Sequence, residues 1–335
     1  DCSLNGRTVK SMEAREAVLE IKTENVSYSL PASQIHIDDV SSEIGTLVSL
    51  EDIKINVSIA EPPPDTLKII EDSSQNGGYQ IVVKPVEFSI TCSSGSRTVE
   101  VSRFNAYVER ILAIPEGIDP SRITTGVVLN RDETFSHVPT DIVMIDGRYY
   151  AKINSLTNST YSVVWSPRTF RDVENHWAKD AVNDMGSRLV VSGIGNDSFE
   201  PDRHVTRAEL AAIIVRSLGL MRSGTGKDVF TDVTEDSWYY DAVSIAYDYG
   251  IIVDCDDMRF RPEDGASREQ ALDMLERAVK ATGIMKEISG YEMMNMLNVY
   301  GGPARPEKGP DGGTGMTRAD AAVIIRGILQ EMGLI

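Results

Sequence analysis

The sequence has few of the residues from which disulfide scaffolds, metal centres and membrane spans are built. Three cysteines are too few for a disulfide scaffold, and the four histidines have no metal-ligand spacing. No apolar run approaches the roughly 20 residues that a membrane span needs. We therefore expect no metal, no cofactor and no membrane-spanning segment.

The cysteines Cys2, Cys92 and Cys255 leave the oxidation state open. A Cys2–Cys92 bridge is one alternative, and free thiols are the other, which we favour. The sequence contains no feature that decides between them.

The chain has fewer cationic than anionic side chains. The 33 Lys and Arg residues stand against 51 Asp and Glu, so the formal net charge is −18, and both halves of the chain are acidic. This balance argues against a broad nucleic-acid-binding face and against binding to anionic membranes by charge alone. An anionic partner must therefore be held by a local basic site.

Motifs of catalysis are missing as well. The sequence has no Gly-x-Ser-x-Gly and no phosphate loop, and its many carboxylates form no pair of defined separation. We expect no enzymatic activity. Because the chain begins with Asp1 and has no basic start followed by an apolar stretch, it looks like a mature chain or a fragment.

The first half of the chain reads mainly as strands. Apolar and polar side chains alternate over Ile53–Ile59 and Val86–Cys92, and Thr160–Trp165 is another β-rich run. Glu16–Lys22 fits either a strand or a short helix. Turn signals separate the runs at Pro62–Asp65, Asn76–Gly78, Ser94–Gly95 and Asp146–Gly147. This spacing favours a β-sandwich, or two small ones in series.

The apolar period changes after Pro167. Trp177, Ala181 and Met185 are four residues apart, as on one face of a helix, and helices are predicted over 205–218 and 266–279. We place the boundary near 166–170 and predict two domains, 1–168 and 169–335.

An internal repeat organises the second half. Phe170–Val173 returns as Phe230–Val233, Trp177 as Trp238, and Phe199–Pro201 as Phe260–Pro262. Thr206–Glu209 returns as Ser267–Gln270 and again as Thr317–Asp320. The interval from the tryptophan to the arginine of this last motif is 30 residues in both of the first two units.

This order of motifs resembles the S-layer homology (SLH) family. The resemblance covers about 165 residues, with repeats at about 169–222, 229–283 and 284–335. The third repeat matches only at Met316–Leu334 and lacks the tryptophan. The resemblance implies that three repeats pack into one pseudo-threefold helical unit. It also implies binding to secondary polymers of the Gram-positive cell wall, typically sugars that carry a ketal-linked pyruvate.

The preceding region also has a familiar pattern. Ile123–Val128 and Ile153–Tyr161 resemble a β-rich module that often precedes such repeats in Bacillota surface proteins. The expected fold class is therefore α+β and multidomain, with a β-sandwich-like region followed by an α-helical pseudo-threefold repeat domain.

The Thr-Arg-Ala-Glu motif has a structural and a binding interpretation. Thr206 with Glu209 is a capping box that begins a helix, which explains both residues without a ligand. It leaves unexplained a cation at the first helical position in all three repeats: Arg207, Arg268 and Arg318. We favour a bidentate clamp for the carboxylate of a pyruvate ketal. The alternative is an ion pair with a neighbouring repeat's Asp172 or Asp232.

Two further features are candidates for contact with a sugar. The helix-start spacing of Trp177 and Trp238 favours burial in the core, and the alternative is a stacking surface for a pyranose ring. Gly193 and Gly195 allow a backbone to approach a sugar closely, whereas the matching turn of the second repeat, 253–258, is acidic and lacks glycine.

The expected function is noncovalent anchoring of a secreted surface protein to the cell wall. The alternatives are a self-assembling S-layer segment, or a spacer for an upstream enzyme domain. If Arg207 shares a groove with the Gly193–Gly195 turn, Arg207→Ala should weaken polymer binding more than Arg268→Ala. If Arg207 faces the acidic turn, the ranking reverses.

Overall fold

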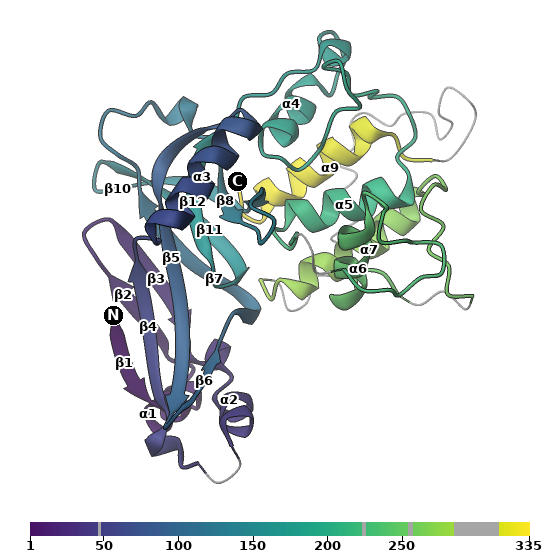
Figure 1. The fold of residues 1–335 in the computed structure, drawn as a ribbon. Coiled ribbons are helices and arrows are strands. Elements are labelled where there is room, and N and C mark those ends of the chain that lie inside the picture. Colours follow the sequence, from purple (N-terminus) through teal and green to yellow (C-terminus); the bar gives the residue numbers. More distant parts are fainter. Residues whose placement is uncertain (46–47, 223–225, 254–256, 285–314) are drawn as a thin grey trace. The chain divides into compact units, whose positions relative to one another are not determined.

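The structure is a computed structural model that describes residues 1–45, 48–222, 226–253, 257–284 and 315–335. The described chain divides into two compact units. The first comprises Asp1–Leu129 and Thr140–Trp165, and the second comprises Asn130–Pro139 and Ser166–Ile335. Strands dominate the first unit and helices the second (Figure 1).

The first unit contains two antiparallel sheets. One has the strand order β1 (Cys2–Asn5), β4 (Lys54–Ala60), β5 (Gln80–Ser94), β12 (Thr160–Trp165) and β8 (Thr125–Leu129), and β6 (Arg97–Glu100) also pairs with β5. The other has the order β10 (Thr140–Ile145), β11 (Arg148–Thr157), β7 (Arg103–Ala113), β3 (Val26–Pro31) and β2 (Val18–Lys22). The predicted strands are confirmed, and the ambiguous segment before Lys22 is strand β2.

The same unit contains helices that the alternation did not predict. They are α1 (Gly6–Glu13), α2 (Ile37–Ile44) and α3 (Pro64–Gly77). The proline run that predicted a turn begins α3 instead, because Pro64 at the first helical position needs no amide partner. The predicted turn at its other end is the helix stop, where Gly78 has φ +70°.

A buried arginine joins the two sheets of the first unit. Arg110 of β7 is fully buried, and its guanidinium lies 4.6–6.0 Å from the ring centroids of Tyr28, Phe88, Phe104 and Tyr161. These rings come from both sheets. Among the described residues the guanidinium has no carboxylate partner, and it donates to the carbonyl oxygens of residues 108 and 157 and to the side chain of residue 158. The cation is therefore stabilised by aromatic faces and dipoles.

The cysteines of the first unit are free. Cys2 of β1 pairs with Val57 of β4, and Cys92 of β5 pairs with Ile55 on the other edge of β4. A whole strand therefore separates them, about 9–10 Å at the usual strand spacing, which is beyond the reach of a disulfide. The bridged alternative is wrong. Burial raises the pKa of the Cys92 thiol to about 11.

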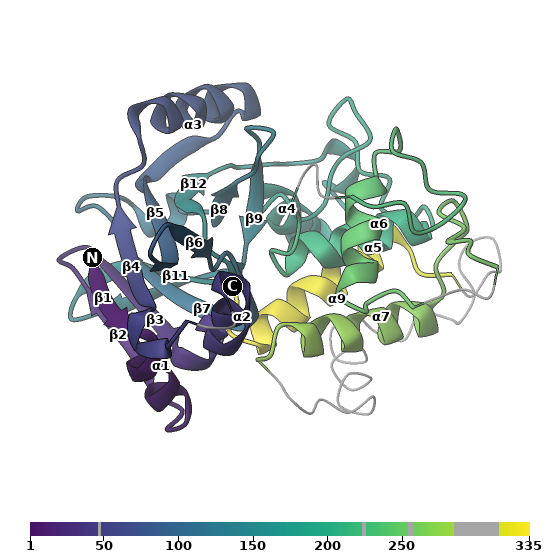
Figure 2. The same cartoon turned by 60° about the horizontal axis from the view of Figure 1, so that its bottom comes forward.

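The second unit is built from paired helices. They are α4 (Lys179–Ser187), α5 (Arg207–Ser217), α6 (Tyr240–Asp248), α7 (Arg268–Ala281) and α9 (Arg318–Glu331), with the short strand β9 (Phe135–Val138) packed on α5. The helices predicted around residues 205–218 and 266–279 are confirmed. Helix α5 is central and contacts α6, α7 and α9 (Figures 1 and 2). No helix in the described ranges is both long and apolar enough to span a bilayer.

Three extended segments before α5, α7 and α9 form a closed ring of backbone hydrogen bonds. The amide of Val205 donates to the carbonyl of Met316 (2.9 Å), the amide of Ala266 to that of Val205 (2.9 Å), and the amide of Met316 to that of Ala266 (3.2 Å). All three side chains are buried. The ring therefore brings together the starts of three helices that lie far apart in the sequence.

We predict that Arg110→Ala lowers the free energy of unfolding of the first unit by about 3–5 kcal/mol, because it leaves a cavity among four rings and removes the donors to the carbonyls of residues 108 and 157. Urea denaturation measures the change. Arg103→Ala, at an exposed position of the same strand, is the control and should change stability by less than about 0.5 kcal/mol. Equal losses for both variants would contradict a core role for Arg110.

Candidate ligand-binding groove

Capping boxes fix the start of each repeat helix. The hydroxyl of Thr206 accepts from the amide of Glu209 (3.2 Å), and the Glu209 carboxylate accepts from the amide of Thr206 (3.0 Å). Ser267 with Gln270, and Thr317 with Asp320, form the same box. The predicted caps are thus confirmed. Each box places an arginine at the first helical position: Arg207, Arg268 and Arg318.

The box of the third repeat places Arg318 against the first repeat. Its Nε donates to the carbonyl of Phe199 (2.8 Å), its Nη2 donates to the carbonyl of Ser192 (2.7 Å), and Nη1 is paired with Glu209. The guanidinium lies 4.5 Å from the centroid of the Phe199 ring, and the side chain is only 6% exposed. The protein itself satisfies much of the hydrogen-bonding capacity of Arg318.

Arg207 occupies the same position one repeat further on. Its Nε donates to the carbonyl of Phe260 (2.8 Å), and its guanidinium lies 4.9 Å from that ring's centroid. Each of these arginines therefore packs on the Phe-x-Pro segment of another repeat. Arg268 begins α7, but the corresponding stretch of the third repeat falls in 285–314, outside the described residues.

This geometry corrects the expected pairing of arginines with turns. Arg318 contacts the turn that contains Gly193, whereas Arg207 packs on the second repeat, so the assumed pairing of Arg207 with Gly193–Gly195 is wrong. The physical reason is the backbone ring, which offsets each helix start by one repeat. The acidic turn of the second repeat has its central residues, 254–256, outside the described ranges.

The aspartates proposed as ion-pair partners have another role. The carboxylate of Asp172 accepts from the amides of Phe199 and Glu200 (2.7–2.9 Å), and that of Asp232 accepts from the amides of Phe260 and Arg261 (2.8 Å each). Burial opposes their ionisation, but the donors outweigh it and hold the pKa of both carboxyls below the usual range. They close the repeat loops, and Glu209 is the carboxylate that pairs with Arg318.

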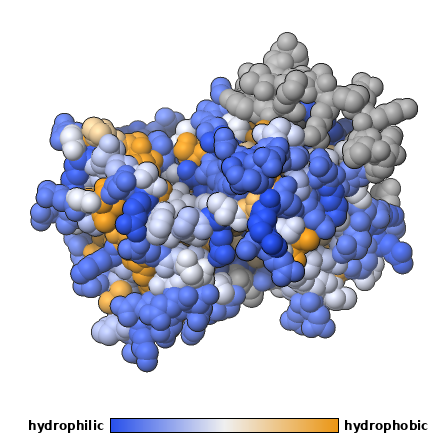
Figure 3. Space-filling model, turned by 90° about the horizontal axis from the view of Figure 1, so that it is seen from above, coloured by the Kyte–Doolittle hydropathy of each residue, from blue (hydrophilic) through white to orange (hydrophobic). Residues whose placement is uncertain are grey.

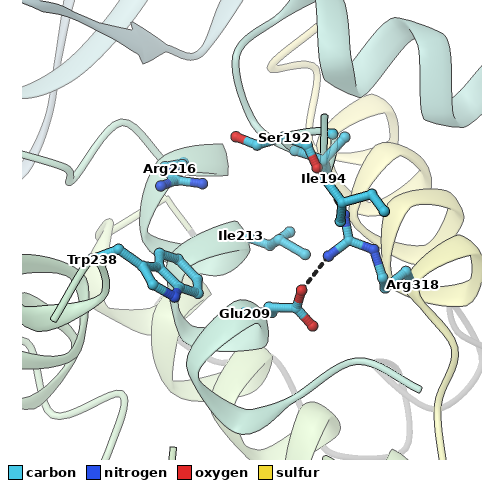
Figure 4. A pocket seen from close by; sticks show the side chains of 9 residues that line it. Ser192, Ile194, Glu209, Ile213, Arg216, Trp238 and Arg318 are labelled. Carbon is cyan, nitrogen blue, oxygen red and sulfur yellow. Dashed lines mark hydrogen bonds and ion pairs between the residues drawn. The ribbon is translucent and has the colours of Figure 1, made fainter. Parts of the chain in front are cut away.

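A cavity of about 270 Å³ lies beside Arg318. It is lined by Val191, Ser192, Gly193, Ile194, Glu209, Ile213, Arg216, Trp238 and Arg318. We call it the first groove. Figure 4 shows Arg216 and Trp238 at one side of the view, Ile194 and Arg318 at the other, and the Glu209–Arg318 ion pair near its centre. Two arginines and one glutamate give its lining a net positive charge within an acidic chain.

Gly193 and Gly195 allow the backbone conformation of their turn. A Cβ on Gly193 would lie 2.8 Å from the Phe170 ring and 2.8 Å from the carbonyl oxygen of Ser198, so only glycine fits. Gly195 has φ +109°, which a side chain would disfavour. Of the two, only Gly193 lines the first groove. Glycine here lets the turn close tightly around Phe170.

The expected burial of the tryptophans is wrong. Trp177 is 44% exposed and Trp238 is 58% exposed. Helices α4 and α6 begin two residues later, so the side chains directed to the core are those of the next residues, Ala178 and Tyr239. Figure 3 shows a mostly hydrophilic face seen from above, on which apolar residues gather in small groups. Among the large apolar side chains that are exposed, Trp238 and Ile194 line the first groove.

Arg216 was not predicted as a groove residue, and Glu209 was predicted only as part of a cap. The available signal was a lone cation directly after the apolar run Leu210–Val215 of α5. A charged residue that follows such a run on a buried helix needs a polar or ligand environment. In the described part of the chain, no cluster of three or more His, Cys, Asp or Glu residues is suited to a metal ion.

The internal repeat matches a known family of protein domains. The S-layer homology domain model matches residues 169–211 and 229–272. Residues 169–272 of the second unit are therefore similar to two tandem S-layer homology repeats. The match covers the first two repeats, and the third repeat and the β-rich module before them remain predictions.

Relatives of the chain include enzymes and surface proteins. An amylopullulanase of Thermoanaerobacterium thermosulfurigenes is 29% identical over 273 residues, which cover 76% of this chain and 14% of that protein. An exoglucanase, XynX, of Acetivibrio thermocellus is 31% identical over 194 residues, or 52% of this chain and 18% of that protein. A surface-layer 125 kDa protein of Lysinibacillus sphaericus is 34% identical over 108 residues, which cover 32% of this chain and 9% of that protein. The chain thus spans less than a fifth of each relative.

We predict that Glu209→Gln lowers the free energy of unfolding by about 3 kcal/mol at pH 7, because Arg318 stays buried without its carboxylate. Gln270 closes the same capping box in the second repeat, so the substitution preserves the cap and removes only the charge. Urea denaturation measures the effect, and Glu269→Gln, exposed on α7, is the control.

The loss of stability caused by Glu209→Gln should depend on pH. Burial opposes ionisation of Glu209, but donors from Arg203 and Thr206 outweigh it and hold the pKa of this carboxyl below the usual range of a glutamate. Because the pKa of Glu209 is lower in the folded protein than in the unfolded chain, the ion pair stabilises the fold at any pH above the pKa of the unfolded chain. This stabilisation is lost as the pH falls through the pKa of the folded protein. The difference between wild type and Glu209→Gln should therefore shrink below about pH 4. A constant difference would contradict the ion-pair role.

Proposed function

We propose that the chain anchors a secreted bacterial protein noncovalently to the cell wall, by binding a pyruvylated secondary wall polysaccharide. The matches to the S-layer homology domain and to surface-layer proteins support wall binding. The first groove supports the choice of ligand, because it combines cations for a carboxylate with an exposed tryptophan for a sugar ring. We further propose that the chain has no catalytic activity of its own.

The observation that carries this proposal is the composition of the first groove. Its lining has a net positive charge although the chain carries −18. The indole of Trp238 and the side chain of Ile194, 52% exposed, offer apolar surface to one face of a pyranose. An acidic sugar satisfies both features, whereas a neutral sugar satisfies only the second.

We propose that the repeats form a pseudo-threefold unit in which only the first groove is complete. The ring of Val205, Ala266 and Met316 supports the threefold arrangement. At the position of Trp238, the third repeat has no tryptophan, and at that of Arg216 it has Gly327. The second repeat replaces the glycines of the turn with Asp254 and Asp256. By sequence, the corresponding positions of the other repeats therefore lack a tryptophan, a cation or the turn glycines.

The alternative functions are a self-assembling S-layer segment and a spacer for an upstream enzyme domain. The relatives include surface-layer proteins, an amylopullulanase and an exoglucanase, which is consistent with both alternatives. Concentration-dependent assembly of the chain in sedimentation experiments would favour the first, and a monomer at all concentrations the second.

We predict that the chain sediments with purified Gram-positive wall sacculi and loses this binding when the secondary polymer is stripped from them. The reason is that the first groove is suited to an anionic sugar and not to the peptidoglycan backbone. A pull-down before and after stripping measures the change. Equal binding to stripped sacculi would refute the polymer as ligand.

We predict that Trp238→Ala weakens binding to intact sacculi by about tenfold or more, whereas Trp177→Ala has a smaller effect, because only Trp238 lines the first groove. Binding isotherms measure both. Since both side chains are exposed, the melting temperatures should stay near that of wild type. Equal loss for the two variants would refute a single functional groove.

A further inference from the structure

The two arginines of the first groove differ in how the protein uses them. Arg318 is held by two carbonyl oxygens, the Phe199 ring and the Glu209 carboxylate. Arg216 also lines the groove, but no hydrogen bond or ion pair joins its guanidinium to another described residue. Burial lowers the pKa of Arg216, and no neighbouring carboxylate opposes this effect. A partly buried cation without an internal partner is available to an external anion.

The equivalent position of the second repeat holds an arginine that has partners within the protein. Arg277 lies ten residues after the capping Ser267, as Arg216 lies ten after Thr206. Arg277 forms an ion pair with Asp273 (3.6 Å) and donates to the carbonyl of Ile251 (3.5 Å). Arg216 has no such aspartate, because Ala212 occupies the matching position in α5. The unpaired charge is thus a property of the first groove.

Glu209 decides which cation an incoming carboxylate can use. It occupies the groove beside Arg318 and also pairs with Arg203 (2.6 Å). A carboxylate that approached Arg318 would meet the Glu209 charge at close range, and like charges repel strongly in a partly buried site. Arg216 lies at the other side of the view in Figure 4 from Arg318, and the ion pairs of Glu209 among the described residues are with Arg318 and Arg203, so a carboxylate that binds Arg216 leaves those pairs intact.

We infer that Arg216, rather than the helix-start Arg318, is the residue that selects a carboxylate-bearing sugar in the first groove, an inference that rests on the proposed function. Arg216 binds the carboxylate, Trp238 and Ile194 contact the sugar ring, and Arg318 holds the turn against α9. The cavity, about 270 Å³, suits one sugar unit of a polymer.

This role has a signature that a structural role lacks. An unpaired, desolvated guanidinium opposes folding of the empty protein, so its removal should leave the melting temperature unchanged or raise it. A residue needed for packing would lower the melting temperature when removed. Loss of affinity together with retained or increased stability therefore identifies a binding residue.

The test is titration calorimetry of the full chain with a monosaccharide that carries a pyruvate ketal, and with the methyl ester of the same sugar. We expect wild type to prefer the free acid. Arg216→Gln should weaken binding of the acid by roughly ten- to a hundredfold and leave the ester unchanged. The matched control, Arg277→Gln, should leave both affinities unchanged.

The outcomes are distinguishable. If Arg216→Gln keeps the preference for the acid, the inference is overturned while the proposed function stands. If wild type binds acid and ester equally, anion selection by this groove is refuted. If wild type binds neither, the proposed ligand class fails, and the inference with it. A lower melting temperature for Arg216→Gln with unchanged affinity would make Arg216 a structural residue.

Discussion

The backbone ring of Val205, Ala266 and Met316 is the constraint on which the second unit depends. Each segment donates to one neighbour and accepts from the other, so the helix starts of all three repeats are fixed together. The ring also offsets the repeats, which is why Arg318 of the last helix contacts the turn of the first repeat. A groove assembled in this way needs residues about 130 positions apart, and no single repeat contains it.

Both units bury guanidinium groups, and in both units similar contacts offset the cost of removing the charge from water. Arg110 lies among four aromatic rings, and Arg318 lies on one ring and beside Glu209. Carbonyl oxygens accept from both. Since a buried cation is costly without such partners, the partly buried Arg216, which has none among the described residues, is the exception in the second unit. That contrast separates cations that hold the fold from one that is available to a ligand.

The sequence was informative wherever a local rule decides the outcome. Alternation predicted β4 and β5, and the capping boxes predicted the starts of α5, α7 and α9, because both depend on neighbouring residues. Contacts between repeats could not be predicted from the sequence, because the contact of Arg318 with the first repeat depends on closure of the backbone ring. The exposure of Trp238 depends on where α6 begins, two residues later than the four-residue spacing suggests. Helix α3 was missed because a proline run predicts both a turn and a helix start.

The claim that three repeats jointly build one wall-binding groove is tested most directly by removing the last helix. We would compare the full chain with a chain truncated after Gly283, measuring affinity for polymer-bearing sacculi and unfolding of the second unit. We expect the truncated chain to lose binding and to unfold more readily, since Met316 and Arg318 are missing from the ring and the groove. Unchanged affinity together with unchanged stability would contradict the shared groove.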